Sequence, residues 1–466
     1  MKISPRIEAF VLKCLPLKLI MRLDRLNSEN LSILKGMAWV MSFLFLAKTI
    51  AAGKEILVAY RYGVSAVVDG YLFVFNLAQW PVSIFFSVTS IILIPYLINL
   101  QKEQPAEASK LNTALLPLAV LLGSATSIIF SLLIWGTVSQ GFVSMTLKSK
   151  SAALTALPFI ALGIIFAFVG VIHSNWLMSQ RRHANTLLEA TPAAVILACL
   201  CGWPIATGDT WDVWPLAVGT LLGFLLQTLW LGKLSQQRFS FAHPRIVAQH
   251  WPALRRAFGI MLLAQVVFTS SGIIDQFFAV HMGEGVLASY SYAQRVMALA
   301  LGLTSVVVGR AMLPVLSSVS NSHKSFVLAL RWAWLFAFVG LLCTLFLFMV
   351  AEWLIILLFQ RGAFSADNTQ EVTQILRILA LQLPFYLFSI VLVQWLGAAG
   401  KAALLLMGAA LGFLAKLSSA LIFYDDGAMG LAASTGVMHC VSAITIYATA
   451  RTAVTHSIRD QEKTNQ

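Results

Sequence analysis

Runs of about twenty apolar residues recur along the chain and restrict the folds that it can adopt. A helix needs about 20 apolar residues to cross a hydrocarbon core about 30 Å thick, and the stretches 113–137, 152–178 and 326–358 reach that length. Of all residues, 59% are hydrophobic and 11% are charged, whereas a soluble domain carries about 25% charged residues. The alternating strands of a membrane β-barrel do not occur in the sequence. The sequence therefore predicts an all-α polytopic membrane protein.

The apolar runs, with the polar stretches that separate them, predict about 12 transmembrane helices. Their ranges are 31–62, 68–99, 113–137, 152–178, 186–206, 213–234, 255–282, 286–316, 326–358, 370–396, 402–423 and 428–450.

The longest polar connection between these helices, 235–253, lies near the middle of the chain. We interpret it as a cytoplasmic linker between an N-lobe at 31–234, with helices 1–6, and a C-lobe at 254–450, with helices 7–12. An amphipathic cytoplasmic segment at 1–30 precedes the N-lobe, and a cytoplasmic tail at 451–466 follows the C-lobe. Because six crossings are an even number, both lobes enter the membrane in the same direction.

The distribution of basic residues predicts which side of the membrane each loop occupies. If the N-terminus is cytoplasmic, about twenty Lys and Arg residues fall on the inner side and about five on the outer side. The outer loops instead carry acids such as Asp209 and Asp367. We therefore expect both termini to be cytoplasmic, and the excess of basic residues to reflect topology and not nucleic-acid binding.

A faint repeat relates the two predicted lobes. The segment 54–73 resembles the segment 274–293, with Glu55 opposite Asp275 and Gly63 opposite Gly283. Parallel repeats of this kind occur in transporters whose two bundles face one another. The sequence thus predicts two pseudo-symmetric six-helix lobes around a central cavity.

Ionisable side chains inside the predicted helices are the candidate functional residues. Each costs about 2.5–3.5 kcal/mol at the bilayer centre, so it needs a partner or an aqueous surface. The set is basic overall and consists of Lys48, Lys54, Glu55, Asp275, Arg295, Arg310, Arg377 and Lys416.

Asp275 and Arg295 flank the turn Gly283–Gly285 at similar distances along the chain. At 1.5 Å per residue both lie roughly 15 Å from that turn, which leaves two readings. They pair with each other and fasten the seventh predicted helix to the eighth, or both line an aqueous cavity where Arg295 binds an anionic ligand and Asp275 orients it.

No sequence motif of a soluble enzyme accompanies these charges. The phosphate loop of ATP hydrolysis, the HExxH zinc motif and a nucleophile elbow are absent from the sequence, so we predict no catalytic residue and no enzyme activity. Cys199 and Cys201 lack further ligands nearby in the sequence, and we interpret them as buried thiols and predict no metal site. No cofactor is expected.

Three stretches resemble the MurJ/MviN family of lipid II flippases: "IDQFFAVHMGEGVLASYSYAQRVMALALGLTSVVVGRAMLPVLS" at 274–317, "LFQRGAFSADNT" at 358–369 and "AKTIAAGKEILVAYRYGVSAVVDGYLFVF" at 47–75. The resemblance implies a flippase in the bacterial cytoplasmic (inner) membrane that moves an undecaprenyl-diphosphate-linked glycan to the outer leaflet by alternating access. It also implies contact with membrane lipids, coupling to the membrane potential or to a cation, and cell-envelope synthesis enzymes as partners.

The resemblance assigns diphosphate binding to three residues, Lys48, Lys54 and Arg295. Asp69, like Glu55 and Asp275, is expected to have a supporting or gating role. Lys and Arg bind a diphosphate through charge-assisted hydrogen bonds.

The sequence departs from the family pattern where an arginine pair is replaced by Val82 and Ser83 and where an acid is replaced by Ala298. These departures leave open a flippase for an exopolysaccharide or O-antigen repeat unit. A cation-coupled multidrug exporter of the same superfamily and a membrane scaffold that recruits envelope enzymes are further alternatives.

Overall fold

The computed structural model describes the backbone of residues 28–464 except 181–187, 204–212, 238–243, 319–321 and 399–403. Side chains are described for most of these residues, but not within 28–44, 238–247, 303–323, 398–403 and 456–464 or at several positions between 249 and 268. The predicted amphipathic segment, 1–30, lies outside the described residues except for its last three, which begin the first helix.

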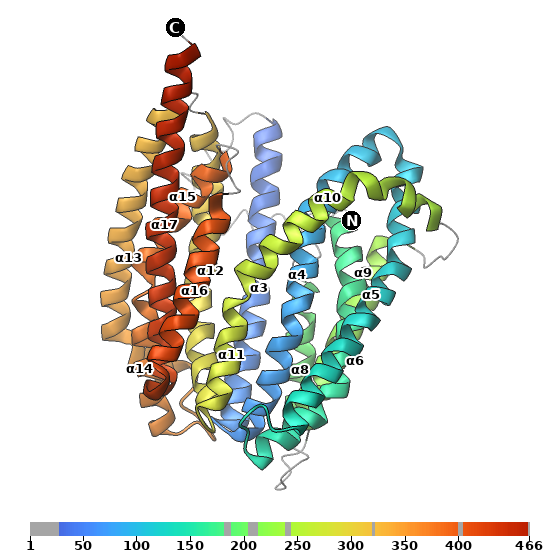
Figure 1. Cartoon of the computed structure of the whole chain (residues 1–466). Helices are drawn as coiled ribbons and strands as arrows, with labels where there is room; N and C mark the ends of the chain where they lie inside the picture. Colours follow the sequence, from blue (N-terminus) through green and yellow to red (C-terminus); the bar gives the residue numbers. More distant parts are fainter. Residues whose placement is uncertain are drawn as a thin grey trace.

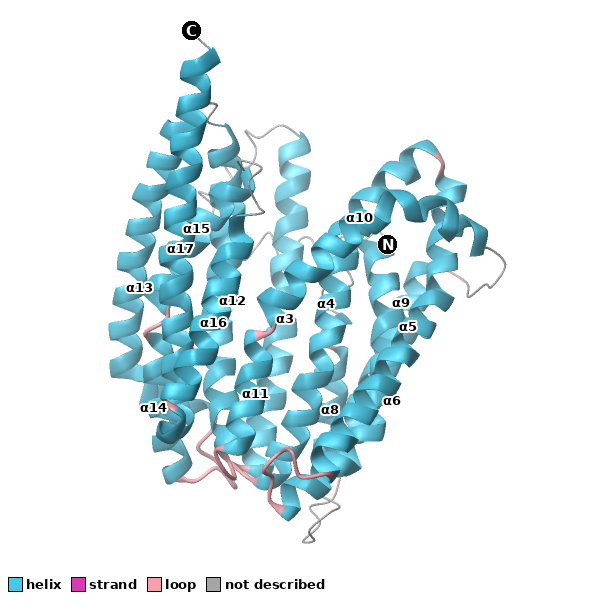
Figure 2. Ribbon diagram, in the orientation of Figure 1, coloured by secondary structure: helices cyan, strands magenta, loops and turns pink. Residues whose placement is uncertain are grey.

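The described chain is helical apart from its turns, as Figure 2 shows. The first half contains α3 (Ser28–Tyr62), α4 (Ala66–Glu103), α5 (Pro105–Ser139), α6 (Leu147–Ser179), α8 (Thr191–Gly202) and α9 (Trp214–Ser235). The second half contains α10 (Pro244–Thr269), α11 (Ser271–His281), α12 (Val286–Ser318), α13 (Ser322–Leu358), α14 (Ala366–Ala380), α15 (Leu383–Ala398), α16 (Leu405–Ile422), the 3-10 turn η3 (Tyr424–Asp426) and α17 (Gly427–Thr464).

The structure divides two of the predicted helices. The range 255–282 is split between α10 and α11 at Ser270, whose hydroxyl donates to the Val266 carbonyl at 2.5 Å. The range 370–396 is split between α14 and α15, which are bent by 42°. Pro384 lies in the first turn of α15, where its missing N–H breaks no hydrogen bond.

Seven helices in the described residues are long and apolar enough to cross a membrane, or eight if α14 and α15 form one bent span. The predicted number of about 12 helices is therefore not confirmed and stays a prediction. One reason is visible in α8, which has 12 residues in the described part of the chain. Two predicted boundaries also differ, because α10 begins inside the predicted linker at Pro244 and α17 continues through the predicted tail to Thr464.

The helices form two groups (Figure 1). Helices α13, α15 and α17 gather on one side and α5, α6 and α9 on the other, while α10 crosses diagonally between them. The N-terminal half of α10 packs on α4 and α5. His250 Nδ1 lies 2.6 Å from the Tyr96 hydroxyl of α4, and its Nε2 lies 3.0 Å from Glu107 Oε1 of α5.

The two groups meet at one end of the bundle, which we call the closed end and define by the turns at 63–65, 283–285 and 359–365. There the Ala363 N–H donates to the Tyr60 carbonyl at 2.8 Å, and the Tyr292 hydroxyl donates to the Gly63 carbonyl at 3.1 Å. Toward the other end, α17 and α5 diverge (Figure 1). The beginning of α3 and the end of α17 lie at that diverging end.

Glycine permits the close approach at the closed end. Gly63 and Gly362 have φ of +57° and +62°, in the region that L side chains rarely adopt. A Cβ on Gly63 would collide with the Ala363 carbonyl, and a Cβ on Gly362 would collide with the Tyr60 carbonyl. The backbone of one lobe thus rests directly on the backbone of the other.

Gly362→Ala should therefore weaken the closed end, because left-handed backbone strain of about 1–3 kcal/mol adds to the collision with Tyr60. Spin labels on the two lobes at this end should show a longer or broader distance distribution than in the unchanged protein. Gly136→Ala is the matched control, since no atom lies within 4 Å of the Cβ that it adds. Identical distributions for both variants would contradict the role assigned to Gly362.

Candidate functional site

One carboxylate, that of Glu55, joins two cations from opposite lobes. Its Oε1 lies 2.5 Å from Lys54 Nζ on the same helix, α3. Its Oε2 forms an ion pair with Arg295 Nη1 on α12. Lys54 is 8% exposed, so it depends on this carboxylate for much of its stabilisation. The cluster thus contains two basic side chains for one carboxylate.

Aromatic rings complete the surroundings of both cations. Lys54 Nζ lies 5.7 Å from the centre of the Phe75 ring, and Arg295 Cζ lies 5.9 Å from the centre of the Tyr292 ring. These distances are within the range of cation–π attraction. The rings stabilise positive charge without neutralising it, which keeps the cluster receptive to an anion.

A cavity of about 330 Å³ opens beside Arg295 between the two lobes. Its wall combines α4 with the α10–α11 break and α12, and four carboxamides face it: Asn76, Gln79, Gln276 and Gln294. Asn76 donates to Gln276 Oε1 at 3.1 Å across the lobes. Lys54 does not line the cavity and reaches it only through Glu55. The cavity is thus lined by one guanidinium and four carboxamides.

The positions that depart from the family pattern lie on cavity walls. Ser83 and Ala298 line the central cavity, and Val82 lines a neighbouring cavity. The wall is therefore less charged than the resemblance implies, and Arg295 is left as its basic residue.

Lys48, the third predicted binding residue, is not brought to this cluster. It is exposed on α3 and interacts electrostatically with Glu189, in the turn before α8. The structure therefore unites Lys54, Glu55 and Arg295 and places Lys48 elsewhere. Its diphosphate-binding role stays a prediction.

Asp69 lies at the closed end, where it joins the lobes. This carboxylate, in the first turn of α4, accepts the N–H of Gly285 at 2.5 Å and the N–H of Ala288 at 2.8 Å. Those donors belong to the turn before α12 and to its first turn, where backbone N–H groups lack partners within the helix. Asp69 thus caps a helix of the other lobe, which fits the gating role that the resemblance implies.

The predicted alternative in which Asp275 pairs with Arg295 is wrong. Asp275 Oδ1 lies 2.6 Å from Lys416 Nζ on α16, and the exposed fractions of the two residues are 3% and 0%. Depth along a hairpin places two residues at one level but does not fix the direction in which they point. Arg295 points to α3, whereas Asp275 points into its own lobe.

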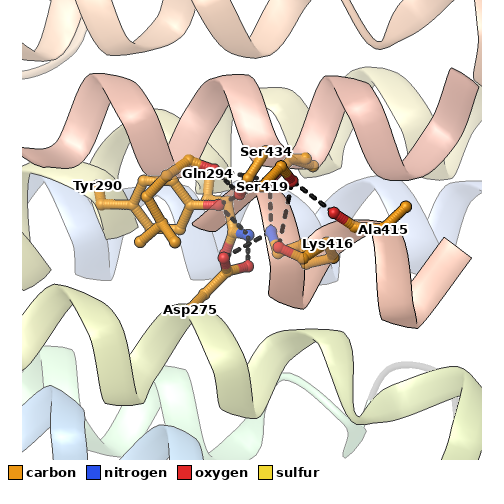
Figure 3. Close-up of polar contacts among 9 residues, drawn as sticks. Asp275, Tyr290, Gln294, Ala415, Lys416, Ser419 and Ser434 are labelled. Carbon is orange, nitrogen blue, oxygen red and sulfur yellow. Dashed lines mark hydrogen bonds and ion pairs between the residues drawn. The ribbon is translucent and has the colours of Figure 1, made fainter. Parts of the chain in front are cut away.

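Figure 3 shows the network around Asp275. Gln294 donates to its Oδ2 at 3.2 Å, Tyr290 also hydrogen-bonds to it, and Lys416 donates to Thr435 Oγ1 at 2.5 Å. The network ties together α11, α12, α16 and α17. We interpret it as the internal fastening of the C-lobe, separate from the cavity cation Arg295.

Sequence reasoning identified Lys416 as an ionisable residue within the membrane but found no partner for it. It missed the carboxamides of the cavity wall, because a neutral amide carries no charge and is therefore not conspicuous in an apolar helix. Among the described residues, no group of three or more His, Cys, Asp or Glu side chains could hold a metal ion.

Comparisons with known proteins agree on one family. The sequence profile described as "Lipid II flippase MurJ" matches residues 58–464. A "Probable lipid II flippase MurJ" of Bdellovibrio bacteriovorus is 33% identical over 182 residues, which cover 36% of this chain and 33% of the relative. The "Lipid II flippase MurJ" of Burkholderia cenocepacia is 26% identical over 376 residues, which cover 75% of this chain and 70% of the relative. The matches to the Bdellovibrio and Helicobacter pylori relatives thus span less than half of their lengths, 33% and 44%.

Solved structures show the same fold. A structure titled "Lipid II flippase MurJ, inward closed conformation" superimposes with a TM-score of 0.75 at 18% identity and covers 89% of this chain and 87% of its own. An inward-facing multidrug transporter of the MATE family in the MOP superfamily gives a TM-score of 0.72 at 13% identity, covering 88% of this chain and 94% of its own. At such identities the likeness concerns the fold alone.

Lys416→Met should destabilise the folded protein by about 3–5 kcal/mol, because it leaves the Asp275 charge buried and unpaired. Thermal unfolding in detergent should show a lowered midpoint. The double change with Asp275→Leu removes both charges and should recover most of the loss.

Lys102→Met, at the exposed end of α4, is the control and should leave the midpoint unchanged. A double variant less stable than Lys416→Met alone would contradict the assignment of the pair as mutually compensating charges.

Proposed function

Because the chain belongs to the lipid II flippase MurJ family, we propose that it moves a lipid II-like polyprenyl-diphosphate-linked saccharide across the bacterial cytoplasmic membrane. The movement runs from the inner to the outer leaflet by alternating access of the two lobes. Family membership rests on the match over residues 58–464. The observation that carries the proposal to this chain is Arg295, a guanidinium that lines a cavity between the lobes.

The charge cluster suits a diphosphate. A guanidinium binds phosphate oxygens through parallel, charge-assisted hydrogen bonds, which are shorter and stronger than those between neutral groups. In the structure Arg295 is held by Glu55. A diphosphate entering the cavity competes with Glu55 for the guanidinium, and the carboxylate then remains with Lys54. The substrate thereby meets the positive charge of Arg295, which Glu55 compensates when no substrate is bound.

The closed end supports an inward-open starting state. With both termini cytoplasmic, as the basic loops predict, the turns at 63–65 and 283–285 lie at the outer surface. The lobes are joined there by Asp69, Tyr292 and Gly63, so the headgroup enters from the inner side. Opening toward the outer leaflet requires Asp69 to release the first turn of α12.

Other cargoes fit less well. A cationic drug is disfavoured because the cavity carries Arg295, although multidrug transporters share the fold. An exopolysaccharide or O-antigen carrier shares the diphosphate and would meet the same cluster, but the family match favours a lipid II-like substrate.

The family is one of transporters, so we propose no catalytic activity and no cofactor for this chain. Coupling to the membrane potential or to a cation, and contact with cell-envelope synthesis enzymes, are further parts of the proposal.

Arg295→Gln should lower the rate of lipid II translocation in reconstituted vesicles by about tenfold or more, because a charge-assisted contact is worth about 1.5–3 kcal/mol. Lys54→Gln should have a similar effect, since it leaves Glu55 to hold Arg295 alone. Lys102→Gln is the surface control. The same assay with other polyprenyl-diphosphate glycans measures the selectivity for the saccharide. Full translocation by the double Lys54 and Arg295 variant would refute the assignment.

A further inference from the structure

A second cavity lies inside the N-lobe and adjoins the central one. It has a volume of about 250 Å³ and lies between α4, α6 and α9. Gln79 and Ser83 line both cavities, so the two spaces meet along one face of α4. A headgroup held at Arg295 therefore has room to extend into the N-lobe.

The two cavities carry opposite charges. Arg295 lines the central cavity, and the carboxylate of Glu189 lines the N-lobe cavity. Glu189 is exposed, and Lys48 is the cation that interacts with it. A carboxylate in the wall of an apolar bundle is costly unless it faces water or a polar ligand. The two ends of the site thus present side chains of opposite charge, Arg295 and Glu189. Each also interacts with a countercharge of the protein, Glu55 and Lys48 respectively.

Several hydrogen-bonding groups that line the two cavities have no partner among the described residues. Within the part of the chain that the structure describes, the side chains of Gln79 and Gln227 make no hydrogen bond with protein groups. The indole N–H of Trp80, which lines the central cavity, is buried without a partner. A buried donor left unpaired costs free energy, and a ligand or water in the cavity removes that cost.

We propose that the N-lobe cavity is a second subsite for the translocated headgroup and binds an amine-bearing part of it. The diphosphate lies at Arg295, Glu189 accepts hydrogen bonds from an ammonium group, and Gln79 and Gln227 bind the neighbouring hydroxyl or amide groups. This inference rests on the proposed function and deepens it. It names the substrate class as a headgroup with a diphosphate at one end and a free amine toward the other.

The polarity of the cavities accounts for this choice of ligand. A carboxylate–ammonium hydrogen bond joins two opposite charges, whereas a neutral glycan offers Glu189 hydrogen-bond donors without a charge. Removing the charge of the amine should therefore weaken binding at one subsite and leave the diphosphate contact intact.

The test compares two polyprenyl-diphosphate glycans in the vesicle translocation assay: one with a free primary amine in its headgroup and the same compound with that amine acetylated. The unchanged protein should prefer the free amine by about tenfold at limiting concentration, the ratio that corresponds to about 1.4 kcal/mol. Glu189→Gln should abolish the preference, chiefly by slowing translocation of the free-amine compound to the rate of the acetylated one. Glu103→Gln, at the exposed end of α4, should retain the preference.

Three results would overturn the second subsite. The unchanged protein moves both compounds equally, or Glu189→Gln keeps the full preference, or Glu189→Gln lowers both rates by the same factor, which identifies Glu189 as a structural partner of Lys48. If the unchanged protein moves neither compound, the proposed function itself fails and the subsite with it. Arg295→Gln separates the two roles, because it should lower both rates and keep their ratio.

Discussion

A charged side chain inside a bilayer needs a partner or an aqueous surface. In this structure two carboxylates are the partners of three cations. Glu55 compensates Lys54 and Arg295, and Asp275 compensates Lys416. The two clusters differ in one respect. The Asp275 pair is sealed among four helices of one lobe, whereas the Glu55 cluster spans both lobes and borders a cavity. Of these two clusters, the Glu55 cluster is the one in which a ligand anion can replace the internal carboxylate.

The contacts between the lobes connect this exchange to the closed end. Arg295 lies on α12, whose first turn is capped by Asp69 from α4. Tyr292, one turn before Arg295, donates to the Gly63 carbonyl at the closed end and lies under the guanidinium. A ligand that draws Arg295 away from Glu55 therefore acts on the same helix that closes the outer end. This arrangement gives a direct physical link between headgroup binding and the opening of the lobes.

Much of the fold follows from the sequence because hydrophobicity and loop charge are local properties. The helical membrane class and the family were evident from apolar runs and from the motif around Arg295. The meeting of Lys54, Glu55 and Arg295 was only partly evident, since the sequence marked each residue as buried without giving its direction. The predicted Asp275–Arg295 pair is wrong for that reason, because Asp275 forms its ion pair with Lys416, far along the chain on α16. Gln79, Gln227 and Glu189 carry no local signal, because their importance arises only when α4, α9 and the turn before α8 surround one space.

The most direct test of the account is the affinity of the purified protein for a soluble short-chain polyprenyl diphosphate, measured by calorimetry for the unchanged protein and for Glu55→Gln. If Glu55 competes with the ligand for Arg295, its neutralisation should tighten binding by about tenfold, since about 1.4 kcal/mol of competing attraction is removed. Unchanged or weaker binding by Glu55→Gln would contradict the claim that the Glu55 carboxylate holds Arg295 for an incoming diphosphate.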